Sequence, residues 1–152
     1  MQKRTFILFS FSIILSLQAF SQTRGNDLVG YWITEDNNAI IKCYNDEGEY
    51  FARVIWYGPF KKENLDKLTP SERKKTSTRF LNNLVLKNFV FEDNEWSQGK
   101  IVQVYEDKTY SAFINEINPN EMKITGYLFF RWLSESTIIK KIAPTDHRIP
   151  KN

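Results

Sequence analysis

The sequence predicts a mainly β protein, a single antiparallel up-and-down barrel of about eight strands with one short helix. Apolar and polar residues alternate in short runs, which is typical of strands that bury one face. Turn residues separate these runs at short, regular intervals, as they do in barrels and sandwiches. Eight strands match the smallest barrels, whose interior is either filled by side chains or holds one small ligand.

The alternation is clear in the first half of the domain. A first strand is predicted at Tyr31–Thr34, and Ala39, Ile41 and Cys43 share one face of the second. The turn residues Asn45–Gly48 then connect to a third strand, so that the second and third strands form a hairpin. One face of this third strand is predicted to carry Tyr50, Ala52, Val54 and Trp56.

A charged stretch interrupts the strand pattern before it resumes. Thr69–Glu72 offers an N-cap threonine, a proline at the first helical position and a glutamate placed to return a hydrogen bond to the start of the helix. A short helix is therefore expected near residues 70–79. The later strands are predicted at residues 84–91, 99–105, 109–114, 122–128 and 137–142, with polar turn residues between them.

The N-terminus has the three parts of a secretory signal. Lys3 and Arg4 precede an apolar run, and Ala19 and Ser21 are small residues at the positions that the signal peptidase requires. The run is shorter than the roughly 20 residues of a membrane-spanning helix, so cleavage between Ser21 and Gln22 is favoured over an uncleaved anchor. We therefore expect an exported protein, periplasmic or secreted, with no transmembrane segment in the mature chain.

The mature chain is expected to form one domain. Residues 1–21 are the signal, 22–27 a flexible lead-in, 28–143 the barrel and 144–152 a C-terminal tail. Loss of Lys3 and Arg4 lowers the formal charge from +3 to +1, which argues against a nucleic-acid partner. Cys43 is the single cysteine, so an internal disulfide is excluded, and a buried apolar role is favoured over an intermolecular disulfide.

Four blocks of the chain resemble a family of exported bacterial proteins known as domain of unknown function 2147. The blocks are Val29–Trp32, Trp96–Ile101, Lys108–Ala112 and Lys123–Leu128. The resemblance covers nearly the whole mature chain and implies export and a barrel-like β-fold, but no activity.

The chain departs from the family pattern at several glycines. Ala52 and Asp107 each replace a glycine that the family usually has, and Asn82 and Asn88 stand near two others. Asparagine tolerates positive φ better than other non-glycine residues, so the turns at Asn82 and Asn88 are expected to persist.

The residue types argue against an enzyme. His147 is the only histidine and lies in the polar tail, so a serine triad, a cysteine–histidine pair and a zinc site are all incomplete. No glycine-rich phosphate loop is present, and no cofactor is expected. A pair of carboxylates, as in glycosidases, is the one catalytic alternative that the composition leaves open.

Aromatic residues supply the candidate site. The chain has four Trp, seven Tyr and twelve Phe, and in a barrel several of them can line a cavity. Arg53 and Arg131 each have aromatic neighbours in the sequence. Their guanidinium groups offer a positive charge, or a forked pair of hydrogen-bond donors, to an acidic group of a ligand. The alternative is structural, since aromatics also fill small cores and a strand arginine usually points outward. The candidate aromatic ligand contacts are Trp32, Tyr50, Trp56, Tyr110 and Tyr127.

Two functional hypotheses follow. The first is a lipocalin-like, non-catalytic protein that binds a small apolar or amphipathic molecule in the cell envelope, which requires an enclosed cavity. The second is a protein-interaction module of the envelope that uses a barrel edge or the charged connector at residues 61–79.

Overall fold

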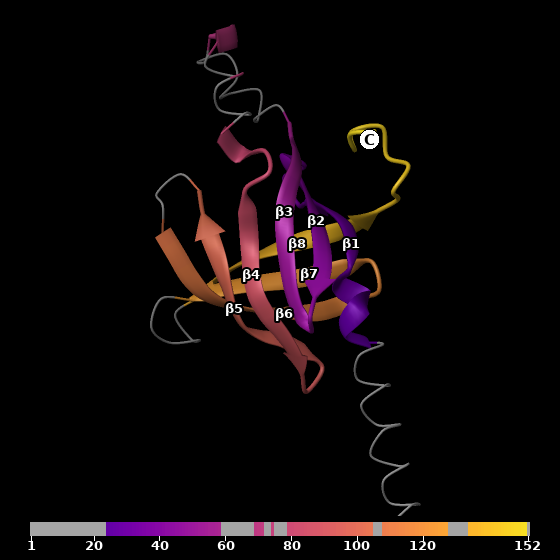
Figure 1. The fold of residues 1–152 in the computed structure, drawn as a ribbon, viewed down its shortest axis with the longest axis vertical. Coiled ribbons are helices and arrows are strands. Elements are labelled where there is room, and N and C mark those ends of the chain that lie inside the picture. The colour runs from indigo at the N-terminus through magenta and orange to yellow at the C-terminus, as the bar shows by residue number, and fades with distance from the viewer. Residues whose placement is uncertain are drawn as a thin grey trace, which may run out of the picture.

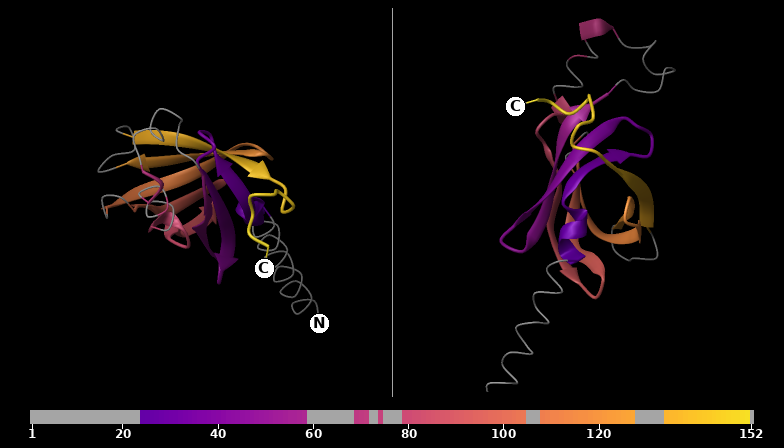
Figure 2. Two further views of the ribbon diagram at one scale, coloured as in Figure 1. Left: turned by 90° about the horizontal axis from the view of Figure 1, so that it is seen from above. Right: turned by 90° about the vertical axis from the view of Figure 1, so that its right-hand side faces the viewer.

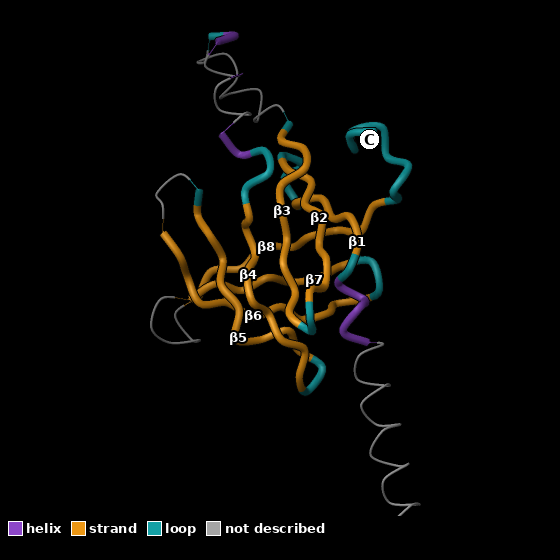
Figure 3. The backbone as a smooth tube through the Cα atoms, in the orientation of Figure 1, coloured by secondary structure: helices purple, strands orange, loops and turns teal. Residues whose placement is uncertain are grey.

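The computed structural model describes residues 24–58, 69–71, 74, 79–104, 108–127 and 134–151. Eight strands make up most of this part of the chain, as Figures 1 and 3 show. A short 3-10 helix, η1 (Asn26–Leu28), precedes them. The strands are β1 (Gly30–Thr34), β2 (Ala39–Asp46), β3 (Glu49–Tyr57), β4 (Leu84–Glu92), β5 (Glu95–Gln103), β6 (Lys108–Asn118), β7 (Glu121–Tyr127) and β8 (Ser134–Ile142).

The strands form a closed antiparallel barrel, which confirms the predicted fold. Each strand pairs with the next along the chain, and β8 returns to pair with β1. The closing register places Tyr31 opposite Ile142 and Thr34 opposite Ile139. Two further views show the sheet bent round on itself (Figure 2). Every described strand therefore has a partner on both sides, and none of them offers a free edge.

The up-and-down order gives the barrel two different ends. The connections that follow β1, β3, β5 and β7 lie at one end, which we call the mouth. The turns after β2, β4 and β6 lie at the other end, which we call the base, and η1 lies there too, just before β1 (Figure 1).

Large side chains fill the base. Trp32, Phe89 and Trp96 are each at most 1% exposed, and Leu28 is buried among them in the same core cluster. The Tyr50 ring meets the Trp96 ring edge to face, with 6.5 Å between centroids. Burying each such side chain contributes about 1.5–3 kcal/mol, so this end of the barrel supplies much of the stability.

The segment before β1 closes the base. The Trp32 indole donates to the Leu28 carbonyl at 2.8 Å, and the Trp96 indole donates to the Gly25 carbonyl at 3.0 Å. The flexible lead-in predicted for residues 22–27 lies outside the described residues at 22 and 23. From Arg24 on, this segment contacts the barrel and satisfies its two buried indole donors.

Irregular residues change the direction of side chains along three strands. The register between β2 and β3 shifts after Ile40, so that Ile55 is an extra residue in β3. Asn88 in β4 and Gln98 in β5 have φ of 55° and 60° beside similar shifts. Asn82, before β4, has a φ of 64°, which confirms the prediction that asparagines take the positive-φ positions near the family's glycines.

The C-terminal tail lies against the outside of the barrel. Cross-strand pairing places Ile33, Ile40 and Trp56 in one row on the outer wall. The Arg148 guanidinium lies over the Trp56 ring, 5.5 Å from its centroid. Asp146 orients that guanidinium by accepting from Nε at 2.9 Å and from Nη2 at 2.8 Å.

The predicted signal sequence and the predicted helix fall wholly or mostly outside the described residues. The signal sequence is predicted at residues 1–21 and the helix near residues 70–79. Within the described residues, no helix has the length and apolar character needed to cross a membrane.

Candidate ligand cavity

The half of the barrel nearest the mouth contains a half-open cavity of about 950 Å³. Its walls come from all eight strands, and the short turns at the base do not contribute to them. Small-molecule sites in proteins usually occupy roughly 300–1,000 Å³, so the cavity is large enough for a ligand of drug size or a single acyl chain. The barrel is therefore packed at its base and hollow at its mouth.

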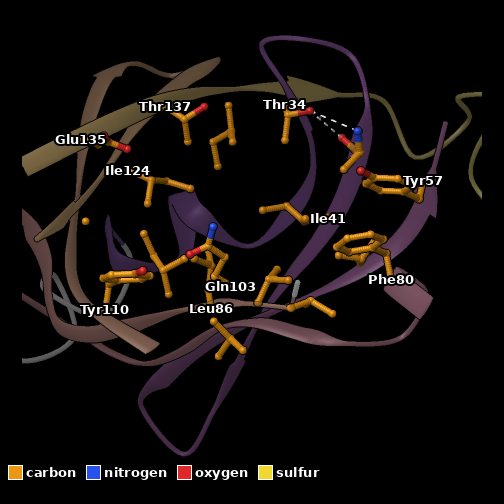
Figure 4. Close-up of a pocket in the computed structure, with 18 of the residues that line it drawn as sticks. Thr34, Ile41, Tyr57, Phe80, Leu86, Gln103, Tyr110, Ile124, Glu135 and Thr137 are labelled. Carbon is orange, nitrogen blue, oxygen red and sulfur yellow. Dashed lines mark hydrogen bonds between the residues drawn. The ribbon is translucent and has the colours of Figure 1, made fainter. Parts of the chain in front are cut away.

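Apolar side chains line the deep part of the cavity. They come from strands on all sides, so a ligand that reached this depth would be surrounded by hydrocarbon (Figure 4). The main apolar lining residues are Ile41, Val54, Leu86, Ile101, Ile124 and Ile139.

Polar side chains line the part of the cavity near the mouth. Figure 4 shows Glu135 and Thr137 from β8, with Gln103 from β5 and Tyr110 from β6. No hydrogen bond or ion pair within the described part of the chain engages these four side chains, so they are available to water or a ligand.

Thr34, also on the cavity wall, is already committed. Its hydroxyl donates to Asp36 at 2.6 Å and accepts from the Ala39 amide at 3.1 Å. Partial burial acts to raise the pKa of Asp36, but hydrogen bonds from Thr34 and Asn38 outweigh it and leave that pKa below its ordinary value. Asp36 is therefore ionised at neutral pH, just outside the mouth.

Two aromatic rings stand on the side of the cavity away from Glu135 and Tyr110 (Figure 4). Tyr57, at the end of β3, stacks on Phe80, which precedes β4, with 4.4 Å between ring centroids. Both rings belong to the cavity lining, and they form an apolar wall next to the opening.

The structure separates the seven residues predicted as ligand contacts. Tyr110 and Tyr127 belong to the cavity lining, whereas Trp32 and Tyr50 fill the base. Alternation puts the Tyr127 side chain on the opposite side of β7 from Ile124, and its ring lies 6.2 Å from that of Phe113. Tyr110 is thus the one predicted aromatic whose strand position directs it inward at the cavity.

The remaining predicted residues are not part of the described lining. Arg53 is exposed and donates from Nη1 to the Asn82 carbonyl at 2.9 Å. Trp56 lies on the outer wall under Arg148. Arg131 falls outside the described residues. The predicted fork for an acidic group is therefore absent from the described walls of the cavity.

Apart from Tyr110, sequence reasoning missed the residues that line the mouth. Tyr57 was missed because strict alternation assigns the inward position to Trp56, and the extra residue Ile55 reverses that assignment. Thr137 alternates with Ile139 on β8, which is the available signal for an inward position. Nothing in the local sequence marks Phe80 or Gln103 as a cavity residue.

The candidate catalytic residues are not assembled into a site. His147 is exposed in the tail beside Asp146. Cys43 is 1% exposed in the core, as predicted, and burial raises the pKa of its thiol well above the ordinary range, with Lys141 opposing the shift. Within the described residues, no three His, Cys, Asp or Glu side chains are placed to hold a metal ion.

The closed eight-stranded barrel and its half-open interior define a lipocalin-like fold. Among solved structures, the chain is similar to protein HP1028 of Helicobacter pylori, which is described as belonging to the lipocalin family. The two share 17% identity over 77% of this chain and 84% of the other, with a TM-score of 0.53. At this identity the likeness shows the fold alone.

The family follows from the sequence match. Residues 30–141 match the model of DUF2147, described as an uncharacterized protein conserved in bacteria, and the chain belongs to this family. This confirms the resemblance inferred from the four sequence blocks. No curated protein matches the chain.

Proposed function

We propose that this protein is an exported, non-catalytic binding protein of the cell envelope that carries a small, partly apolar molecule in its barrel. The observation that supports this most directly is the cavity of about 950 Å³, apolar at depth and polar near the mouth. A lipocalin-like barrel is a fold that suggests small-molecule binding. Cleavage between Ser21 and Gln22 would release the barrel outside the cytoplasm.

An empty apolar cavity costs stability, because its lining loses packing contacts. The base shows that this chain can pack an interior fully with Trp and Phe. At the mouth, by contrast, Thr137 and Gln103 occupy wall positions and the space remains. The contrast between the two ends supports a hollow that is kept for a ligand.

The first experiment is native mass spectrometry of the mature protein, residues 22–152, purified gently from the envelope of its own host. We expect a reproducible extra mass that is lost on denaturation. The mass of the protein alone also reports where the signal is cleaved.

A matched pair of variants ties the extra mass to the cavity. Thr137→Trp places a large ring in the hollow, whereas Ser136→Trp places the same ring on the outer face of β8. The bound mass should disappear in the first variant and persist in the second. A bare native protein, or a mass that survives Thr137→Trp, would refute the proposal.

A further inference from the structure

The described wall of the cavity carries negative charge only. Glu135 is the one charged side chain among the described residues that line the cavity, and no described residue pairs with its carboxylate. Lys108, which begins β6 opposite Gln103, has an interaction of its own and is not part of the lining. Arg53 is turned outward toward Asn82.

Further acidic groups stand on the same part of the rim. Glu35 and Asp36 follow Thr34 at the mouth and are exposed. The Glu35 amide donates to the Ile138 carbonyl at 3.0 Å, so this turn lies directly beside β8, the strand that carries Glu135. The described rim along β1 and β8 is therefore negative.

The polar and apolar parts of the cavity are ordered by depth. Along β8, Glu135 is nearest the mouth, Thr137 follows, and Ile139 lies deepest. Four residues of strand span about 13 Å, which leaves room for a hydrocarbon chain below a polar head. A carboxylate accepts hydrogen bonds and attracts positive charge, and it repels an anion.

From this arrangement we infer that the ligand is a single-chain amphiphile with a net positive head, an amine or a quaternary ammonium. Its head lies at Glu135, within reach of Thr137 and Gln103, and its chain extends past Ile124 toward Leu86. This inference rests on the proposed function, since it requires an occupied cavity, and it names the class of ligand.

The test compares four probes that share one octyl chain and differ in their heads. Octyltrimethylammonium is cationic, 1-octanol is neutral, octyl sulfate is anionic and octylphosphocholine is zwitterionic. Isothermal titration calorimetry measures the dissociation constant of each. We expect the ammonium to bind about fivefold more tightly than the alcohol, the size of an exposed ion pair, and the sulfate to bind more weakly than both.

The zwitterionic probe separates a free cationic amphiphile from a lipid headgroup that carries a phosphate. Because its phosphate cancels the charge of the ammonium, it should bind like 1-octanol. Binding as tight as that of octyltrimethylammonium would overturn the requirement for a net positive head.

Glu135 variants locate the preference. Glu135→Gln should remove the advantage of the ammonium over the alcohol, and Glu135→Lys should make the sulfate the tighter ligand. Glu92→Gln, which removes the same charge at the base, should change nothing. A cation preference that survives Glu135→Gln, or an anion that binds native protein as tightly as the cation, would overturn the inference.

The outcomes also distinguish this inference from the proposed function. Equal binding of all four probes, abolished by Thr137→Trp, would refute the cationic head and leave the carrier function standing. Failure of every probe to bind would overturn both for ligands of this size.

Discussion

At the scale of single residues, asparagine supplies left-handed backbone where the chain bends. Asn82 has a φ of 64°, its amide donates to the Val54 carbonyl at 2.8 Å, and its carbonyl accepts from Arg53. These contacts hold the turn before β4 in this conformation. A β-branched residue pays about 1–2 kcal/mol to adopt it, whereas glycine adopts it freely.

We predict that Asn82→Val lowers the free energy of unfolding by about 1–2 kcal/mol, while Asn82→Gly changes it by less than about 1 kcal/mol. Urea unfolding followed by far-UV circular dichroism measures both. Lys123→Val, at an exposed strand position without a positive φ, is the control and should be nearly neutral. Equal losses for the Val and Gly variants of Asn82 would show that the backbone conformation is not the cause.

Two single residues show how far the cavity lining could be predicted from the sequence. Tyr110 was predicted to contact the ligand and does line the cavity, because β6 alternates without interruption there. Trp56 was predicted by the same rule and lies outside, because Ile55 is one residue too many in β3. Bulges at such positions depend on pairing with distant strands, so local alternation cannot reveal them.

At the scale of elements, the C-terminal tail contacts the barrel through Arg148 over the Trp56 ring, and an ion pair within the tail orients Arg148. Asp146 accepts two side-chain hydrogen bonds and one backbone hydrogen bond from Arg148. These bonds hold the pKa of Asp146 well below its ordinary value of 3.8. A depressed pKa means that the contribution is fully present above pH 3.8 and is lost as the pH falls through the folded-state value.

We predict that Asp146→Asn frees the tail at neutral pH, and that the native tail is released only in acid below pH 3.8. The NMR signals of the Trp56 indole and of the backbone at Ile149 report this release, since Ile149 donates to the Asp146 carbonyl at 3.0 Å. Asp93→Asn, in an exposed turn, is the control. A tail whose signals stay unchanged in Asp146→Asn would contradict the assignment.

Two glycines in different strands report the packing of the two halves of the barrel. A Cβ at Gly99 in β5 would lie 2.2 Å from the Phe89 ring, which is fully buried. A Cβ at Gly126 in β7 would lie 3.1 Å from the Cδ1 atom of Ile101, a flexible tip beside the cavity. The first neighbour has no room to move, and the second can move into open space.

We therefore expect Gly99→Ala to destabilise the protein by about 1–3 kcal/mol through overpacking, and Gly126→Ala to change its stability by less than about 1 kcal/mol. The two variants serve as each other's control, because the chemical change is identical. Thermal and urea unfolding measure the difference. A larger loss for Gly126→Ala than for Gly99→Ala would show that the mouth is packed and the base is not.

At the scale of the whole molecule, the number and order of the strands were predictable because they depend on a repeated pattern rather than on any one residue. Closure of the barrel was left open by the sequence, because it depends on the pairing of β8 with β1, which are far apart along the chain. All eight predicted strands are present, although β5 begins at Glu95, earlier than the predicted Gly99. The division into a filled base and a hollow mouth was not predictable, because the same residue types serve both ends. Trp32 and Tyr110 both point inward, and only their height in the barrel separates a core residue from a cavity residue.

The segment before β1 closes the base, so we expect its removal to lower the stability of the whole fold. A chain that begins at Arg24 keeps the whole described segment before β1 and serves as the reference. A chain that begins at Gly30 loses the buried Leu28 side chain, worth about 2–5 kcal/mol, and the carbonyl acceptors of the Trp32 and Trp96 indoles. Since small domains are stable by only about 5–15 kcal/mol, we expect this chain to lose fixed packing, seen as loss of near-UV circular dichroism. A chain from Gly30 as stable as the one from Arg24 would show that β1 to β8 close the base without this segment.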